Sequence, residues 1–280
     1  MRRLLSALKD ASPGMLVTVG TERGFMEAAN APSINRLVII DKSEAVITYN
    51  QINILLLRMA KDRDHYLRLR LRPDIEEWNA AARFAGLSSE EQRFLVRHQA
   101  QWKIRVAEHY LFRNFHRPPR ANAAFAEVNY LFDDGLFAPI QDLARTGGIE
   151  TYHIDLEDLE KVTELIVRLR LIGLPLSILD LSNAWMGRYL SREGLTHLIA
   201  ELNGLASDKS LLVITDLPLI GSFRYTVYTF DHIREYRNME AFSRMLQRTD
   251  LIPRGFQTRM NPVGLVETCE TLLRALWHHP

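Results

Sequence analysis

Short apolar runs rich in β-branched residues alternate with helical patterns along this chain, and this alternation limits the folds that it can adopt. Five such runs lie at 15–20, 36–41, 150–156, 174–182 and 209–218. Runs of this kind are typical of strands that are buried on both faces. Amphipathic helical segments separate the last three runs, so the sequence predicts a mostly parallel sheet with helices on both faces.

The last part of the chain has a different pattern. The segment "FRYTVYTFDHI" (223–233) alternates aromatic and β-branched residues, and "GFQTRM" (255–260) is a last short apolar run. A helical segment lies between them, so these two strands are expected to close one edge of the sheet as an antiparallel pair. The prediction is therefore a sheet of seven strands.

The middle of the chain, residues 43–149, contains no convincing strand. Its helical patterns cover 43–72, 88–115 and 121–137. We expect this segment to be a helical insertion that caps the carboxyl edge of the sheet. The predicted domains are accordingly a sheet domain, 1–42 and 150–280, and the helical cap, 43–149.

Composition excludes several classes of protein. The 35 basic and 34 acidic residues leave a formal net charge of +1, which does not favour binding to nucleic acid. Lys9 and Asp10 interrupt the apolar residues that follow the basic start, so no signal peptide is predicted. The sequence contains no uninterrupted run of about 18 apolar residues, so no membrane span is predicted. The single cysteine, Cys269, excludes an intrachain disulfide and favours a reducing compartment, so we expect a cytoplasmic protein.

The junction after the first predicted strand is the first candidate site. Ligands of open parallel sheets bind beyond the carboxyl ends of the strands. Gly20 and Gly24 in "VGTERGF" allow a ligand to approach the backbone, and Asp41 ends the second strand 21 residues after Gly20. A carboxylate at that position can accept both hydroxyls of a ribose. The alternative is that the glycines only end a strand and that the acid only caps a helix.

The ligand of this site is not expected to be a dinucleotide or a nucleoside triphosphate. The chain lacks G-x-G-x-x-G and G-x-x-x-x-G-K-[ST] after this strand, so the turn offers poor access for a pyrophosphate. The pattern resembles class I S-adenosylmethionine-dependent methyltransferases, although "VGTERGF" has two glycines where that family commonly has three. The resemblance covers about half of the chain and implies a Rossmann-like α/β fold with S-adenosylmethionine as cofactor. The cofactor-binding residues that it implies are Gly20, Thr21, Glu22, Gly24, Phe25, Asp41, Lys42, Asp155 and Trp185.

In that family the acid after strand two binds the ribose, and a residue near the end of strand three reaches the adenine. On this resemblance Asp41 would hold the ribose and Asp155 would lie near the adenine. The run 150–156 could instead be strand four, which would move Asp155 to the reaction centre.

The segment "DLSNAW" (180–185) would line the reaction centre. Asp180, Ser182 and Asn183 offer groups that bind an amine or a carboxylate of the substrate, and the ring of Trp185 could attract a sulfonium cation. The alternative is that Ser182 or Asn183 caps the next helix.

A second pair of catalytic candidates lies in the predicted cap. Asn129 and Tyr130, on a predicted helix, would supply a polar contact and an aromatic wall if the cap closes over the cofactor. The alternative is ordinary helix packing.

The resemblance implies an enzyme that transfers a methyl group from S-adenosylmethionine to a small molecule. Two alternatives stay open: the same cofactor could donate its aminocarboxypropyl group or cyclise to azetidine-2-carboxylate with release of methylthioadenosine, or the protein could bind without catalysis. H-E-x-x-H and zinc-type Cys/His spacings are absent, as is G-x-S-x-G, so neither a metal nor a hydrolase nucleophile is predicted. A homodimer is compatible with the sequence.

Overall fold

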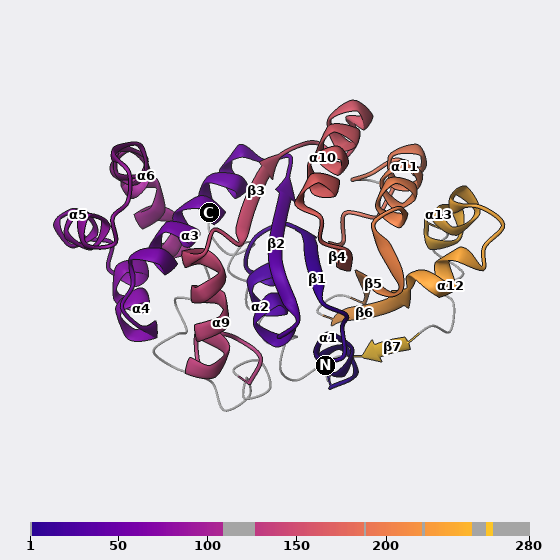
Figure 1. Cartoon of the computed structure of the whole chain (residues 1–280), viewed down its shortest axis with the longest axis horizontal. Coiled ribbons are helices and arrows are strands. Elements are labelled where there is room, and N and C mark those ends of the chain that lie inside the picture. Colours follow the sequence, from indigo (N-terminus) through magenta and orange to yellow (C-terminus); the bar gives the residue numbers. More distant parts are fainter. Residues whose placement is uncertain (1, 109–126, 188, 220–221, 248–255, 260–280) are drawn as a thin grey trace.

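The computed structural model describes residues 2–108, 127–187, 189–219, 222–247 and 256–259 of the 280-residue chain. Its strands are β1 (Gly14–Val19), β2 (Ile34–Asp41), β3 (Ile149–His153), β4 (Leu176–Ser182), β5 (Ala206–Leu219), β6 (Ser222–Thr229) and β7 (Phe256–Arg259). They form one sheet in the order β3-β2-β1-β4-β5-β6-β7 (Figure 1). Strands β1 to β5 are parallel, β6 is antiparallel to β5, and the four-residue β7 extends the edge beyond β6. The predicted α/β class and mostly parallel sheet are confirmed.

The position of β3 excludes one of the alternatives left open by the sequence. β3 pairs with β2 at the edge of the sheet, where Asp41 lies opposite His153. The next strand in the chain, β4, lies on the other side of β1. The run 150–156 therefore contains strand three, and the direction of chain progression reverses between β1 and β4.

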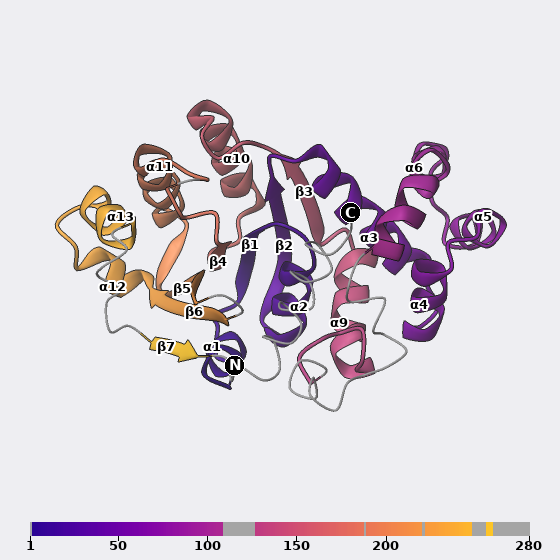
Figure 2. The ribbon, with the colours of Figure 1, turned by 180° about the vertical axis from the view of Figure 1, so that it is seen from behind.

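Helices cover both faces of this sheet. They are α1 (Arg2–Lys9), α2 (Glu22–Asn30), α3 (Glu44–Met59), α4 (Arg63–Leu71), α5 (Ile75–Phe84), α6 (Ser89–Glu108), α9 (Asp134–Arg145), α10 (Leu159–Ile172), α11 (Arg192–Asn203), α12 (Phe230–Arg234) and α13 (Met239–Gln247). Successive strand residues point to opposite faces, so Leu16 belongs to one buried cluster and Val17 to the other. The first cluster includes residues of α1 to α6 and α9, and the second includes residues of α10 to α13. Figures 1 and 2 show the two helical layers from opposite sides.

The helices of 43–149 differ from the prediction. The expected single helix over 43–72 is divided into α3 and α4, because Asp62 begins a new helix by accepting a hydrogen bond from the His65 amide at 2.7 Å. Residues of α3 to α6 share the buried cluster of α2 and the sheet, and Figure 1 shows these helices beyond the β3 edge. The described part of this segment therefore packs beside and against one face of the sheet, whereas the sequence predicts a cap over its carboxyl edge.

The predicted helix over 121–137 is wrong over residues 127–133, whereas 134–137 form the start of α9. Residues 121–126 lie outside the described chain, and Asn129 and Tyr130 belong to turns that precede α9. The side-chain oxygen of Asn129 accepts a hydrogen bond from the Leu131 amide at 3.0 Å, which stabilises a turn in place of a helix. α9 begins after Asp133, whose carboxylate caps the Leu136 amide at 2.9 Å.

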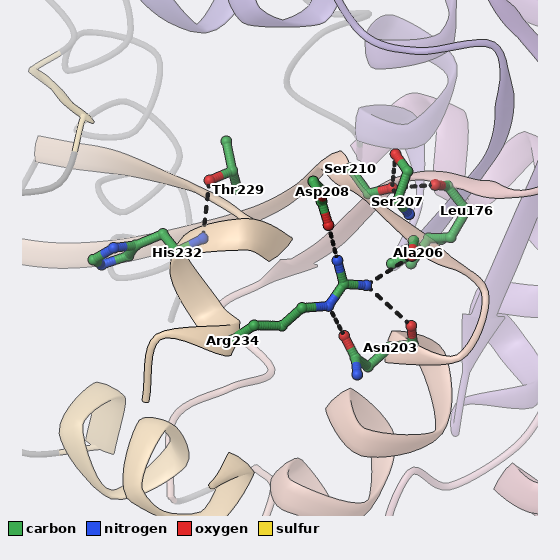
Figure 3. Close-up of polar contacts among 9 residues, drawn as sticks. All are labelled: Leu176, Asn203, Ala206, Ser207, Asp208, Ser210, Thr229, His232 and Arg234. Carbon is green, nitrogen blue, oxygen red and sulfur yellow. Dashed lines mark hydrogen bonds and ion pairs between the residues drawn. The ribbon is translucent and has the colours of Figure 1, made fainter. Parts of the chain in front are cut away.

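At the other end of the sheet, the predicted strand over 223–233 stops at Thr229, and α12 follows directly. The Thr229 hydroxyl caps α12 through the His232 amide at 3.3 Å. Figure 3 shows how the last residue of α12, Arg234, reaches the connection between α11 and β5. Its guanidinium donates to the Asn203 side chain at 2.9 Å and to the Ala206 carbonyl at 2.7 Å.

Two further predictions concern Cys269 and membrane-spanning segments. Cys269 lies outside the described residues. Among the helices that the structure describes, none combines the length and the apolar character needed to cross a bilayer.

Candidate functional site at the carboxyl edge of the sheet

A pocket of about 260 Å³ lies beyond the carboxyl ends of β1, β2, β3 and β4. Its lining comes from 19–20, 40–42, 154–156, 182–184 and 189–190. This position includes the point between β1 and β4 where the chain progression reverses, which is where open parallel sheets bind ligands. None of the described residues of 43–149 is among the lining residues. We call this cavity the switch-point pocket.

Gly20 forms one wall of the switch-point pocket and has a backbone that favours glycine. Its φ is +94°, and no atom lies within 4 Å of the position that a Cβ would occupy. A ligand can therefore come close to the main chain at this point. Asn50, a fully buried residue of α3, holds the turn by donating to the Gly20 carbonyl at 2.9 Å.

The rest of the predicted glycine turn is a helix. The backbone of Thr21 precedes α2, which starts at Glu22, and Gly24 and Phe25 lie inside the helix. A Cβ on Gly24 would lie 2.5 Å from Cγ2 of Thr18, so Gly24 allows α2 to pack closely on β1. Phe25 is a fully buried core residue. The prediction that Gly24 and Phe25 contact a cofactor is therefore corrected, because both serve packing.

Charged side chains line the wall formed by β2 and β3. One carboxylate oxygen of Asp41 accepts a hydrogen bond from the Ser43 amide at 2.8 Å, and the side chain is partly buried at the pocket. Lys42 Nζ lies 4.0 Å from Asp155 Oδ2, in a pair that is about half exposed. His153 contacts the Lys42 carbonyl at 2.9 Å and lies outside the lining. The structure thus brings together Asp41, Lys42 and Asp155, as the resemblance implies.

The opposite wall is formed by a strained turn at the end of β4. Ser182 has a φ of +49°, which is uncommon for a residue other than glycine, and its amide donates to Asp180 Oδ1 at 2.7 Å. Ser182 and Asn183 line the pocket, as the sequence predicts. Backbone strain held by a buried hydrogen bond is common at functional sites.

Asp180 itself is not among the residues that line the pocket. It is fully buried on the face covered by α2, where its Oδ2 lies 2.7 Å from Arg23 Nε. The same Arg23 Nε lies 3.0 Å from Oε1 of Glu27, one turn further along α2. Burial raises the pKa of Asp180, against the opposing effect of Arg23. The predicted direct contact of Asp180 with substrate is corrected, because its buried side chain pairs with Arg23 and is not among the lining residues.

Three other predicted site residues also lie outside the lining. Trp185 is buried in the second core and donates from its indole to the Thr215 carbonyl at 2.9 Å. Asn129 is buried in its turn, and the Tyr130 hydroxyl lies 3.1 Å from the guanidinium of Arg70 in the first core. These three side chains therefore stabilise the packed interior, and their predicted roles in cofactor binding or catalysis are corrected.

The aromatic side chain that lines the pocket is Tyr189, which the sequence reasoning missed. It lies only four residues after Trp185, in the same segment between β4 and α11. Glu157 holds the end of this segment to the loop after β3, because its carboxylate accepts from the Ser191 hydroxyl at 2.7 Å and from the Ser191 amide. The sequence does show a long polar segment after a buried strand, which indicates a site there. It does not show which aromatic ring of that segment faces the pocket, because ring orientation depends on the fold. Among the described residues, no three His, Cys, Asp or Glu side chains gather as a metal site.

Comparison with known proteins gives a family and a distant structural likeness. The family model described as "Domain of unknown function (DUF7790)" matches residues 4–253. No curated protein matches the chain. Among solved structures, an rRNA methyltransferase, aviRa from Streptomyces viridochromogenes, is similar over 77% of this chain and 70% of that chain, with 13% identity and a TM-score of 0.34.

Proposed function

The chain belongs to the family described as Domain of unknown function (DUF7790), and from the geometry of its pocket we propose that it is an S-adenosylmethionine-dependent enzyme that transfers a methyl group to a small-molecule acceptor. The observation that carries the proposal is the pairing of Gly20 with Asp41 in one pocket at the reversal of the sheet. The open backbone of the first and the carboxylate of the second are the two features that a nucleoside site needs.

The residues present fit the nucleoside part of such a ligand. Asp41 has a second carboxylate oxygen besides the one that accepts from Ser43, and it lies at the carboxyl end of β2, where a ribose would lie. Apolar side chains of Ile40, Ile154 and Leu156 also line the pocket, and an adenine ring would pack against them. The space beside Gly20 admits the ligand next to the main chain.

The charges of the pocket favour a cationic ligand over a phosphate. Its ionisable lining residues are the carboxylates of Asp41 and Asp155, the ammonium of Lys42 and the phenol of Tyr189. No arginine is among the lining residues, so a pyrophosphate would meet more negative than positive charge. A sulfonium and an α-amine carry positive charge and are suited to this lining.

The reacting end of the cofactor would lie toward Ser182, Asn183 and Tyr189. When bound, S-adenosylmethionine supplies an activated methyl group. The polar groups of Ser182 and Asn183 would orient the amino acid part or the acceptor, and the Tyr189 ring would shield the reacting atoms from water. The residues of this chain therefore bind, align and exclude water, and no general base is required for an amine or thiolate acceptor.

Product analysis tests this proposal against the other chemistry open to the same ligand. The protein is incubated with S-adenosylmethionine, with and without a panel of small amines and thiols, and the products are followed by mass spectrometry. We expect S-adenosylhomocysteine together with a methylated acceptor. If the products are instead methylthioadenosine and a new four-carbon cyclic amino acid, the reaction is cyclisation of the cofactor and methyl transfer is contradicted.

Thermal unfolding separates catalysis from binding alone. A ligand at about 100 times its Kd should stabilise the folded protein by about 2.7 kcal/mol. Stabilisation by S-adenosylmethionine without any product from the acceptor panel would favour a binding protein. Absence of both stabilisation and product would contradict the proposed cofactor.

A further inference from the structure

A buried charged cluster is linked to the switch-point pocket by one hydrogen bond, from the Ser182 amide to Asp180. It contains Arg23 and Glu27 of α2 and Asp180 of β4, and one atom, Arg23 Nε, contacts a carboxylate oxygen of each acid. The side chain of Arg23 is 17% exposed, that of Glu27 is 5% exposed and that of Asp180 is 0% exposed. The guanidinium also donates to the Thr215 hydroxyl of β5. The Thr18 hydroxyl of β1 donates to Asp180, so α2, β1, β4 and β5 all contribute to the cluster.

The number of charges in this cluster does not balance if both acids are ionised. Among the described residues, the titratable groups that face it are Arg23, Glu27, Asp180 and the phenol of Tyr225, whose ring lies 4.5 Å from the guanidinium carbon. One guanidinium can compensate one carboxylate, and a second buried negative charge is costly. Two carboxylates in contact with each other relieve this cost by sharing one proton.

The contacts indicate which acid carries the proton. Asp180 Oδ1 accepts from the Ser182 amide, and Oδ2 accepts from Arg23 and from the Thr18 hydroxyl at 3.4 Å. Glu27 accepts from Arg23 through Oε1, and no donor reaches its buried Oε2. Burial, followed by the negative charge of Asp180, raises the pKa of Glu27 well above its ordinary value. Glu27, with its unpartnered Oε2, is therefore the acid that we expect to carry the proton.

The cluster is connected to both walls of the pocket. Arg23 lies in the first turn of α2, three residues after Gly20. Asp180 Oδ1 holds the amide of Ser182 in the strained turn that lines the opposite wall. We propose that Glu27 and Asp180 hold one proton between them and that, with Arg23, they form a buried positioning cluster for the Ser182–Asn183 wall of the pocket. This inference rests on the proposed function only where ligand affinity is the readout.

Two substitutions of the same kind, carboxylate to amide, are expected to change ligand affinity by very different amounts. Glu27→Gln imitates a protonated acid and keeps a donor toward Asp180, so affinity for S-adenosylhomocysteine should change by less than about two-fold. Asp180→Asn has one oxygen where two are needed, so either Ser182 or Arg23 loses its acceptor. Its affinity should fall about ten-fold or more, as expected for one lost charge-assisted hydrogen bond. Equal losses in the two variants would overturn the proposal.

Two further measurements do not need a ligand. The infrared spectrum of the wild type at neutral pH should contain the carbonyl stretch of a protonated carboxylic acid, and Glu27→Gln should lack it. In protein with ¹⁵N-labelled serine, the Ser182 amide resonance should move in Asp180→Asn and stay in place in Glu27→Gln. A wild type without the acid band, or a Ser182 resonance unaffected by Asp180→Asn, would overturn the positioning cluster.

These measurements also separate the two proposals. If Asp180→Asn fails to fold, the infrared comparison of the wild type with Glu27→Gln still decides whether the proton is present. If the wild type shows the acid band and Asp180→Asn shifts the Ser182 resonance, but the wild type binds no S-adenosylhomocysteine, the proposed function fails and the positioning cluster stands.

Discussion

Gly20 and Gly24 lie four residues apart, and each needs the absence of a side chain for a different reason. Gly20 has a positive φ and open space beside it, so its role is conformational and leaves the main chain accessible. Gly24 has helical geometry, and a side chain there would collide with Thr18 on β1. Both residues therefore position the start of α2, and only Gly20 reaches the pocket.

Gly24→Ala should destabilise the protein although alanine favours helix formation. The new Cβ would lie 2.5 Å from Thr18 Cγ2 and 3.3 Å from Leu37 Cδ1, and overpacking of this kind costs about 1–3 kcal/mol. Thr18→Ser removes the colliding methyl group and keeps the hydroxyl that donates to Asp180. Urea unfolding of the two single variants and the double variant should show a favourable coupling of about 1 kcal/mol. Additive effects would contradict the packing role of Gly24.

The raised pKa of Glu27 makes a prediction about stability and pH. The folded state keeps the Glu27 proton at pH values where the unfolded chain has lost it, so this contribution is complete below the ordinary value of 4.5 and falls as pH rises toward the folded pKa. The slope is at most about 1.4 kcal/mol per pH unit. Glu27→Gln has no proton to lose, so its stability relative to the wild type should increase as pH rises above 4.5. Urea unfolding over a pH series checks this, and a constant difference between the two proteins would contradict a protonated Glu27.

Among the elements, the strands were the most predictable and the helices near the site the least. The runs that became β1, β2 and β4 are apolar and β-branched over most of their length, so their positions follow from composition. α2 was missed because its sequence, ERGFMEAAN, is short, contains a glycine and begins immediately after the strand turn. The division between α3 and α4 depends on the cap formed by Asp62, which a continuous amphipathic pattern conceals.

The connection of α12 to the sheet depends on Arg234. In Figure 3 its guanidinium lies among acceptors from the end of α11 and the start of β5. Arg234→Met keeps the apolar stem and removes bonds to Asn203, Ala206 and Asp208, which should lower the free energy of unfolding by about 1–2 kcal/mol. Arg244→Met is the matched control, because Arg244 pairs with Glu240 in a contact that is about half exposed, and it should cost less than about 0.5 kcal/mol. Equal effects in urea unfolding would show that the bonds of Arg234 add nothing.

In the molecule as a whole, strand order decides which predicted residues meet. Four different strands, whose carboxyl ends share one edge, carry the predicted site residues at or just after their ends. The convergence of these residues could therefore be predicted from the alternation of strands and helices; they are Gly20, Asp41, Asp155, Ser182 and Asn183. Side-chain direction could not be predicted in the same way. Asp180 and Trp185 lie in the same predicted segment as Ser182, but the face that each side chain meets depends on the register of β4 and on the helices that cover it.

The two faces of the sheet also differ in what they contribute. The first core contains the helices of 43–149, and the second contains those that follow β3, β4 and β6. Segments after β1 to β4 supply the switch-point pocket, while Asn50 of α3 holds Gly20 from outside its lining. The described part of 43–149 thus supports the pocket from one face of the sheet.

The most direct measurement is a calorimetric titration of S-adenosylhomocysteine into the wild type, Asp41→Ala and Asp64→Ala. Asp64 is an exposed carboxylate on α4 outside the pocket lining and serves as the control. We expect the wild type and Asp64→Ala to bind with the same affinity and Asp41→Ala to bind about ten-fold or more weakly, because the ribose hydroxyls lose their carboxylate acceptor. No binding to the wild type, or equal affinity in all three proteins, would contradict a nucleoside site at the switch-point pocket.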